Sequence, residues 1–127
     1  MGDLSKNFSR SEFACKCGCG FDTVDAELIK ILQAERDFLN QRITITSGCR
    51  CIEYNEKVQK KANTNYIPYS SKSLHLQGRA ADHVAEHNKP INQHRFLKTL
   101  SPGGLGLYKT FVHVDTRSHE SVRWDYS

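Results

Sequence analysis

The stretch SLHLQGRAADH, residues 73–83, holds two side chains of types that bind metals, His75 and Asp82, on either side of Gly78. Its second half lies within RAADHVA, residues 79–85, which is predicted to be a strand in which successive side chains point to opposite faces. Glycine accepts backbone conformations that other residues avoid, so Gly78 allows the chain to fold back and bring His75 towards Asp82. By itself the stretch fits either a metal-binding turn or an ordinary loop followed by a strand.

A second pattern, TFVHVDT at residues 110–116, offers a further ligand that such a metal site would need. On a strand, His113 and Asp115 share one face, and the neighbouring valines suit a core on the other. If this strand pairs antiparallel with the first, Asp82 and His113 meet above the sheet, and His75 reaches the same point. Two imidazoles and one carboxylate leave one position of a zinc tetrahedron free for water, which is the arrangement of catalytic zinc. An isolated histidine on a half-buried strand is otherwise an ordinary polar residue.

Hydrophobic periodicity and turn residues predict the other elements. They are a helix capped by Asp22 and ending near Asn40, a strand over 42–47, helices over 52–63 and 91–100, and strands over 105–109, 110–116 and 122–126. Helices come early in the chain and most strands come late, which indicates an α+β fold. We expect a small antiparallel sheet that carries the zinc site and packs against two or three helices. At 127 residues, the chain is expected to form a single domain, 1–127.

Charge and hydropathy argue against several classes of protein. The net charge is +4, but the basic residues are scattered and not interleaved with aromatics, so nucleic acid is not an expected partner. No apolar run approaches about 18 residues, so no membrane span is expected. The N-terminal MGDLSKNFSR lacks the basic start and apolar core of a secretory signal, which predicts synthesis in the cytoplasm without a signal peptide. We expect a monomer.

The cysteines leave several interpretations open; they are Cys15, Cys17, Cys19, Cys49 and Cys51. An odd count and no export signal argue against a full disulfide framework. Buried thiols are one interpretation, and a structural zinc or a disulfide that ties the N-terminal segment to the chain near Cys49 is another. The C-x-C-x-C spacing lacks the C-x-x-C pair usual in structural zinc sites, which favours the thiols. A third interpretation, a second metal near nucleic acid, is disfavoured by the scattered charge.

Several segments together resemble a known family. SLHLQGRAAD resembles the S-x-H-x-x-G-x-A-x-D signature of the zinc D-alanyl-D-alanine carboxypeptidases and phage endolysins, which share a metal core with lysostaphin-type peptidases and the hedgehog signalling domain. TSGCRC at 46–51 resembles their S-G-x-R segment, and GGLGLYKTFVHVD at 103–115 their final G-x-G-x-Y and H-x-D segment. FSRSEFACKCGCG at 8–20 resembles the opening of a phage and bacterial branch. The resemblance runs in order from about Phe8 to Trp124 and implies a hedgehog/DD-peptidase-like fold.

The resemblance implies that His75, Asp82 and His113 are zinc ligands and that Arg50 has a catalytic role. A guanidinium there would hold a substrate carboxylate or support the oxyanion formed when water attacks an amide. The alternative for Arg50 is a surface ion pair, which contributes little. If its segment is a strand, Arg50 points to the face opposite its cysteine neighbours. Ser73 is expected to fix the signature loop through a side-chain-to-backbone hydrogen bond.

The general base is where this chain departs from the family pattern. Several relatives place a histidine two residues before the final ligand or a glutamate three residues before it, where this chain has Phe111 and Thr110. Asp115 is the first candidate because it shares the face of His113. The alternative is that Asp115 orients that histidine. The weaker candidates are His83, His119 and Glu120.

Two functions stay open on the sequence. The first is a zinc metallopeptidase, with Zn²⁺ as cofactor, that hydrolyses stem peptides of peptidoglycan as a D-Ala-D-Ala carboxypeptidase or an endolysin does. It would act on the cell wall, either as a phage lysin or as a virion component, and a mild positive charge suits approach to such an anionic polymer. The second is a zinc-binding structural or binding module of a phage tail or wall-attached assembly with little or no catalysis, which the missing base favours.

Overall fold

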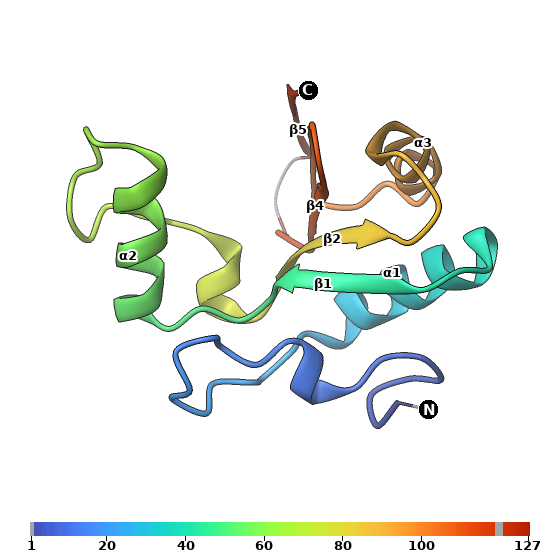
Figure 1. Cartoon of the computed structure of the whole chain (residues 1–127), viewed down its shortest axis with the longest axis horizontal. Coiled ribbons are helices and arrows are strands. Elements are labelled where there is room, and N and C mark those ends of the chain that lie inside the picture. The colour runs from blue at the N-terminus through green and yellow to red at the C-terminus, as the bar shows by residue number, and fades with distance from the viewer. Residues whose placement is uncertain (1, 119–120) are drawn as a thin grey trace.

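The computed structural model describes residues 2–118 and 121–127, and a five-stranded sheet forms its centre (Figure 1). The strands are β1 (Ile43–Ser47), β2 (Ala80–Ala85), β3 (Gly104–Tyr108), β4 (Val112–Asp115) and β5 (Val122–Tyr126). They lie in the order β1-β2-β4-β3-β5. Every strand expected from the sequence is present, with ends that differ by a residue or two, and the α+β class is confirmed.

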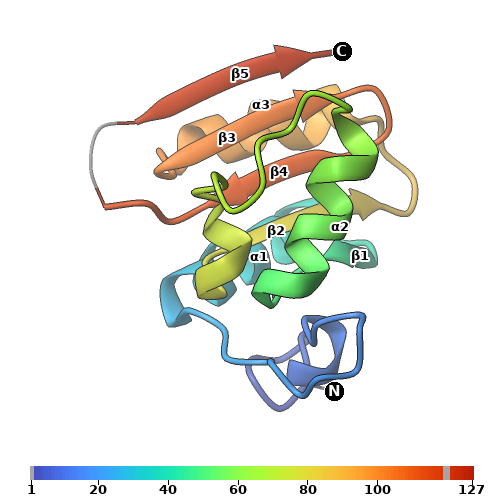
Figure 2. The same ribbon diagram turned by 90° about the vertical axis from the view of Figure 1, so that its left-hand side faces the viewer.

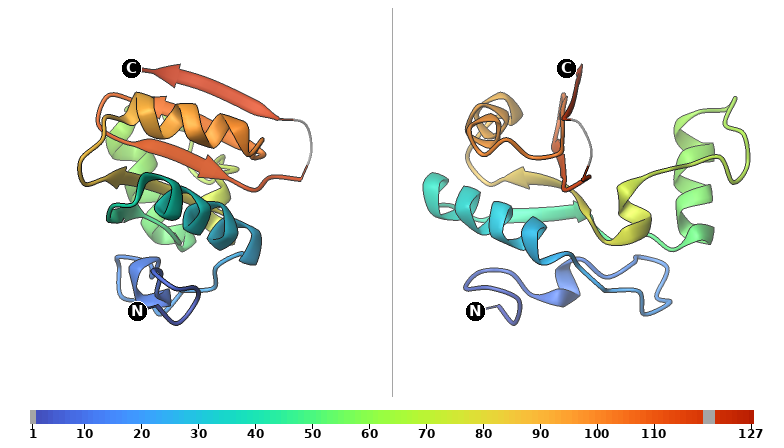
Figure 3. Two further views of the ribbon diagram at one scale, coloured as in Figure 1. Left: turned by 90° about the vertical axis from the view of Figure 1, so that its right-hand side faces the viewer. Right: turned by 180° about the vertical axis from the view of Figure 1, so that it is seen from behind.

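Helices cover both faces of the sheet. They are the 3-10 turn η1 (Arg10–Glu12), the helices α1 (Ala26–Leu39) and α2 (Ile52–Ala62), the 3-10 turn η2 (Leu74–Gln77) and the helix α3 (Pro90–Thr99). α1 and α3 lie on one face, whereas α2 and η2 lie on the other (Figure 2; Figure 3). The N-terminal segment runs past β1, at the opposite side of the molecule from β5 (Figure 2). None of these helices has the length and apolar content needed to cross a bilayer.

The sheet is mixed, which corrects the expectation of an antiparallel sheet. β1 with β2, β2 with β4 and β3 with β4 pair antiparallel, but β5 pairs parallel with β3. Because β2 and β3 occupy both edges of β4, the chain that leaves β4 at Asp115 finds no free edge there. Gly104 pairs with both Asp115 and Val122, so β5 begins at the end of the sheet where β4 stops. The next strand therefore runs beside β3 and in the same direction.

α1 begins later than the sequence predicts. Its N-cap is Asp25, whose carboxylate accepts from the backbone N–H of Leu28 at 3.3 Å, and not Asp22. The backbone N–H of Asp25 also donates to the carbonyl of Gly78 at 2.9 Å, which ties the start of the helix to the signature loop. The helix ends at Asn40, which adopts a left-handed φ of 52°, as predicted.

Alternation along the strands gives the sheet an apolar and a polar face. The apolar face, with Leu105, Val112 and Val114, packs on α1 and α3, which contribute the fully buried Leu28, Leu32 and Leu97 to the same core. Burial of side chains of this size stabilises a fold by roughly 1.5–3 kcal/mol each. The residues that alternate with these apolar side chains along the strands, such as Asp82 and His113, point to the α2 side. The core thus fixes the register that brings polar side chains together on the other face.

Candidate metal centre

The turn η2 carries His75 and is closed at both ends by residues that the sequence analysis singled out. The hydroxyl of Ser73 accepts from the backbone N–H of His75 at 3.2 Å, which is the bond expected of this serine. Gly78 ends the turn with a left-handed φ of 66°. A side chain at Gly78 would overlap the carbonyl oxygen of Thr23, so the bend needs glycine for space as well as for conformation.

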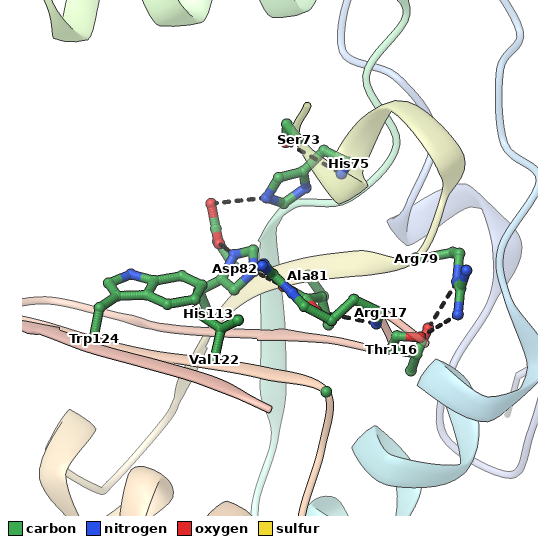
Figure 4. A network of polar contacts seen from close by, with 12 residues as sticks. Ser73, His75, Arg79, Ala81, Asp82, His113, Thr116, Arg117, Val122 and Trp124 are labelled. Atoms are coloured by element: carbon green, nitrogen blue, oxygen red, sulfur yellow. Dashed lines mark hydrogen bonds and ion pairs between the residues drawn. The ribbon is translucent and has the colours of Figure 1, made fainter. Parts of the chain in front are cut away.

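The three predicted metal ligands meet on the polar face of the sheet (Figure 4). Asp82 and His113 are direct partners across β2 and β4, and Oδ1 of Asp82 lies 2.8 Å from Nδ1 of His113. His75 approaches from η2, with Nε2 3.4 Å from Oδ2 of Asp82. One ligand atom from each residue lies within 4.8 Å of the other two. All three residues are buried, so they form a compact donor set at the bottom of a cleft.

Asp115 holds the ring of His113 from the far side. Nε2 of His113 lies 2.7 Å from Oδ2 of Asp115, while Nδ1 faces Asp82. Arg117 binds the same carboxylate, with Nε 2.9 Å from Oδ1 and Nη2 2.6 Å from Oδ2. Asp115 is 0% exposed, and a side chain at its neighbour Gly104 would overlap its carboxylate. Both oxygens of Asp115 are therefore occupied by protein groups.

These contacts keep the carboxylates ionised. Burial alone would raise the pKa of Asp82, but hydrogen bonds from His113 and His75 outweigh it and hold that pKa far below its usual range. Burial likewise opposes ionisation of Asp115, and Arg117 and His113 lower its pKa well below the ordinary value. Burial disfavours the charged form of His113, yet Asp115 and Asp82 raise its pKa. Asp82 and Asp115 therefore carry negative charge beside the His113 ring.

Arg50 lies at the same site and not on the surface, so the alternative of a surface ion pair is wrong. Its side chain is 9% exposed, and Nη2 lies 3.4 Å from Oδ2 of Asp82. Nε donates to Oγ of Ser47 at 3.0 Å and Nη1 to Oδ1 of Asn55 at 3.3 Å. β1 ends at Ser47, as the expected strand over 42–47 does, and residues 48–51 are not a strand, so strand alternation does not set the direction of Arg50.

The donor set opens into a cleft of about 410 Å³ between the sheet and α2. One wall is aromatic: the rings of Tyr108 and Phe111 stack with centroids 4.2 Å apart. The indole of Trp124 has its centroid 5.0 Å from that of His113, and its Nε1 donates to the hydroxyl of Tyr108 at 2.9 Å. Phe111, which stands where several relatives carry a histidine, thus lines the cleft as an apolar surface.

Sequence reasoning did not assign Lys72, Arg117 or Trp124 to this cleft. Lys72 and Arg117 lie outside the predicted helices and strands, where the sequence does not indicate which way a side chain points. A signal for Trp124 does exist in the G-x-G spacing of β3. Gly106 pairs with Trp124, and a side chain at Gly106 would overlap the indole, so the glycine makes room for that ring.

The weaker candidates for the general base contribute no group to the cleft in the part of the chain that the structure describes. His83 is fully buried on the α1 side, with Nε2 2.7 Å from Oε1 of Glu35, which fits the alternation of β2. His119 and Glu120 lie outside the described residues. Among the described residues that line the cleft, the imidazoles and carboxylates are those of His75, Asp82 and His113.

The donor set fits a zinc ion. Nδ1 of His75 lies 2.7 Å from the carbonyl oxygen of Gly48, and Nε2 of His113 is held by Asp115, so each ring has one nitrogen left to face Asp82. Ligating histidines usually donate their second N–H to a carbonyl or a carboxylate in this way. Three protein ligands that open into a cleft leave a coordination position for water or substrate, as in catalytic zinc sites.

The family model described as Peptidase M15 matches residues 6–115. The matched range contains Arg50, His75, Asp82, His113 and Asp115. Neither the curated proteins nor the solved structures contain a match to the chain.

Proposed function

The chain belongs to the peptidase M15 family, and from this premise we propose that it is a zinc metallopeptidase that hydrolyses stem peptides of peptidoglycan. The observation that carries the proposal is the convergence of His75, Asp82 and His113 at the bottom of a cleft, within 4.8 Å of one another. We propose that the whole chain acts as one such domain. D-Ala-D-Ala carboxypeptidase and endolysin action are the two forms that the proposal includes.

His75, Asp82 and His113 would hold the ion through Nε2, a carboxylate oxygen and Nδ1. Bound zinc would supply Lewis acidity, which polarises a scissile carbonyl and makes water a better nucleophile near neutral pH. The buried contacts with the carbonyl of Gly48 and with Asp115 fix both rings before substrate arrives. Such preorganisation lowers the cost of assembling the site in each catalytic cycle.

Arg50 is the proposed catalytic residue that touches substrate. A guanidinium has five N–H donors, and Ser47, Asn55 and Asp82 each take one, from Nε, Nη1 and Nη2 in turn. One N–H remains on each terminal nitrogen. These two donors suit a planar carboxylate or a developing oxyanion at the floor of the cleft. Burial lowers the pKa of Arg50, although Asp82 opposes the shift, and a guanidinium remains charged at any physiological pH.

Asp115 is better suited to orient His113 than to serve as the base. Its carboxylate is fully buried, and both oxygens are bound by His113 and Arg117. Its pKa lies far below neutrality, so it is a weak acceptor for a proton from water. We therefore assign Asp115 the role of a positioning residue.

The cleft's charge and aromatic wall support a stem peptide as substrate. Arg50, Lys72 and Arg117 line it, while Asp82 is the carboxylate among the described lining residues. Stem peptides carry several carboxylates, which such a cationic rim attracts. The rings of Tyr108, Phe111 and Trp124 offer apolar surface to short aliphatic side chains such as those of alanine. The wall is the proposed place of action, reached as a phage lysin or as a virion component.

The test is hydrolysis of purified muropeptides by the zinc-loaded chain, followed by mass spectrometry. We expect cleaved stem peptides from the wild type and none from His75→Ala. Arg50→Lys keeps the charge but loses the fork of donors, so kcat/KM should fall roughly 10²-fold. Arg42→Lys, in an exposed side chain, is the matched control and should be unchanged. Intact muropeptides after long incubation with zinc-loaded wild type would overturn the proposal.

A second candidate function is a zinc-binding module with little or no catalysis, within a phage tail or wall-attached assembly. The observation that favours it is Phe111, which occupies the place of a base with an apolar ring stacked on Tyr108. Measuring zinc content and hydrolysis in wild type and in Asp115→Ala separates the two functions. Bound zinc with no turnover in either protein, together with retention on insoluble peptidoglycan, would favour the module.

A further inference from the structure

Four cysteines converge at a second place in the molecule. The Sγ atoms of Cys15, Cys17, Cys19 and Cys51 all lie within 4.8 Å of one another. Three come from the N-terminal segment, and the fourth is the N-cap residue of α2. A structural zinc site was one of the interpretations left open on the sequence, and the C-x-C-x-C spacing argued against it. The fourth sulfur arrives from a distant part of the chain, which spacing cannot show.

The local backbone is shaped to present three sulfurs together. The N–H of Gly18 donates to the carbonyl of Cys15 at 3.1 Å, and the N–H of Cys15 donates to the carbonyl of Phe21 at 2.8 Å, so the segment closes on itself. Gly18 and Gly20 have φ of 82° and 91°. No atom lies within 4 Å of where their Cβ atoms would be, so the glycines serve conformation and not space.

The distances between sulfurs suit a shared metal ion better than disulfide bonds. Sγ of Cys17 lies 3.4 Å from Sγ of Cys15 and 3.5 Å from Sγ of Cys51, and all five cysteines are free thiols. A disulfide needs about 2.05 Å. Four thiolates at about 2.3 Å from a tetrahedral zinc ion lie about 3.8 Å from one another. The cluster is close to that arrangement.

Hydrophobic packing does not explain the cluster, because Cys17 and Cys19 are exposed. Backbone donors face the sulfurs instead: the N–H of Cys51 lies 3.3 Å from Sγ of Cys15, and the N–H of Tyr54 lies 3.4 Å from Sγ of Cys51. Such donors stabilise thiolates that bind a metal. Cys49 makes a contrast, because it is buried in the apolar core and its thiol donates to the carbonyl of Thr23 at 3.4 Å.

We propose that Cys15, Cys17, Cys19 and Cys51 bind a structural Zn²⁺ ion, separate from the centre at His75, Asp82 and His113. Four protein ligands close the coordination sphere, so this ion would hold structure and take no part in catalysis. It would fasten the N-terminal segment to the start of α2. Because α2 forms one wall of the cleft and Arg50 precedes Cys51 in the chain, the ion would also fix the geometry of the cleft.

The first experiment measures the metal content of the full chain, purified under reducing conditions and saturated with zinc. We expect two zinc ions per chain in the wild type and one in His75→Ala, which loses only the other centre. The double variant Cys17→Ser, Cys19→Ser changes two exposed side chains and should also hold one. Cys49→Ala, the matched control, should hold two. One ion in wild type and none in His75→Ala would overturn the proposal, as would iron in place of zinc.

Cobalt substitution gives a readout that is independent of the stoichiometry and of peptidase activity. Thiolate-to-cobalt charge-transfer absorption should appear in wild type, in His75→Ala and in Cys49→Ala, and should be lost in the cysteine double variant. If that double variant fails to fold, thiol counting on the native wild type decides. Four thiols that react only after chelation support the site, whereas exposed thiols of Cys17 and Cys19 that react at once in zinc-saturated protein overturn it. Failure of muropeptide hydrolysis would leave each of these outcomes unchanged.

Discussion

At the scale of the residue, the proposed role of Asp115 depends on which groups share its carboxylate. A buried aspartate beside a zinc ligand would be a candidate base if one oxygen faced the cleft. Here His113 and Arg117 take both oxygens, and Gly104 allows β3 to close over them. These contacts support the proposal that Asp115 is a fixed negative charge that orients the His113 ring and not the acceptor of a proton.

Asp115→Asn should weaken zinc binding about 10- to 100-fold, because a neutral amide no longer raises the basicity of His113 or neutralises Arg117. Competition with a chromophoric chelator measures the affinity. Asp125→Asn, on the exposed strand β5, is the matched control and should bind zinc as the wild type does. Unchanged zinc affinity with loss of hydrolysis would instead make Asp115 the base.

At the scale of the element, β3 carries glycines where the neighbouring strands β4 and β5 carry larger side chains. Gly104 pairs with Asp115, and Gly106 pairs with His113 on one side and Trp124 on the other. Both glycines face the cleft side, where a side chain would displace either the carboxylate or the indole. The G-x-G spacing of this strand therefore follows from the two groups that support His113.

Gly106→Ala should destabilise the fold by about 1–3 kcal/mol, because the new methyl group overlaps the indole of Trp124. The nearest atoms to that methyl all belong to this one side chain. In a Trp124→Ala background the same substitution should therefore cost much less. Urea unfolding of the four proteins in this cycle measures the coupling. An equal cost in both backgrounds would show that the strain lies in the backbone of β3.

A buried polar cluster on the apolar side of the sheet joins α1, β2 and α3. Glu35 on α1 accepts from Gln93 on α3 at 3.1 Å, and its other oxygen lies 2.7 Å from Nε2 of His83 on β2. Burial alone would lower the pKa of His83, but the charge of Glu35 raises it. A group whose pKa is higher in the folded than in the unfolded state stabilises fully below about pH 6.5, and this contribution is lost as pH rises through the folded pKa.

Glu35→Gln should accordingly reduce the free energy of unfolding by roughly 1–3 kcal/mol at pH 6 and by less at pH 9. Denaturant unfolding at the two pH values measures the difference. Glu27→Gln, on the exposed side of α1, should change stability little at either pH. A loss of the same size at both pH values would show that the pair is not an ion pair in the folded state.

At the scale of the whole molecule, the sequence predicted features that depend on a few neighbouring residues better than features that depend on how distant elements pack together. Period-two alternation and one glycine bend allowed His75, Asp82 and His113 to converge if their strands paired, and the family resemblance implied that they meet as metal ligands. The predicted cap of α1 is wrong because Asp22 and Asp25 both suit a helix start, and the bond that ties Asp25 to Gly78 is tertiary and leaves no local signal. The direction of β5 depends on which strand edge is free, and the sequence does not state that.

The cysteines show the same limit. Their spacing within the N-terminal segment argued against a metal, since the fourth sulfur of the group belongs to the start of α2.

The aromatic residues of the N-terminal segment pack into the core of the molecule. Phe8 and Phe13 are each 1% exposed and belong to the same core as Leu28 of α1 and Val114 of β4. One continuous core from the N-terminal segment to β4 is the physical basis for proposing a single domain.

The chain should therefore unfold in one cooperative step. For 127 residues, the unfolding enthalpy near 60 °C should be about 90 kcal/mol, and the calorimetric and van 't Hoff values should agree. The proposed zinc ions would bind the folded state, so saturation with zinc should raise the Tm without splitting the transition. The variant Cys17→Ser, Cys19→Ser should keep one transition at a lower Tm, because Phe8 and Phe13 still anchor the segment in the core. A separate early transition, in scanning calorimetry of either protein, would show that the N-terminal segment is a unit of its own.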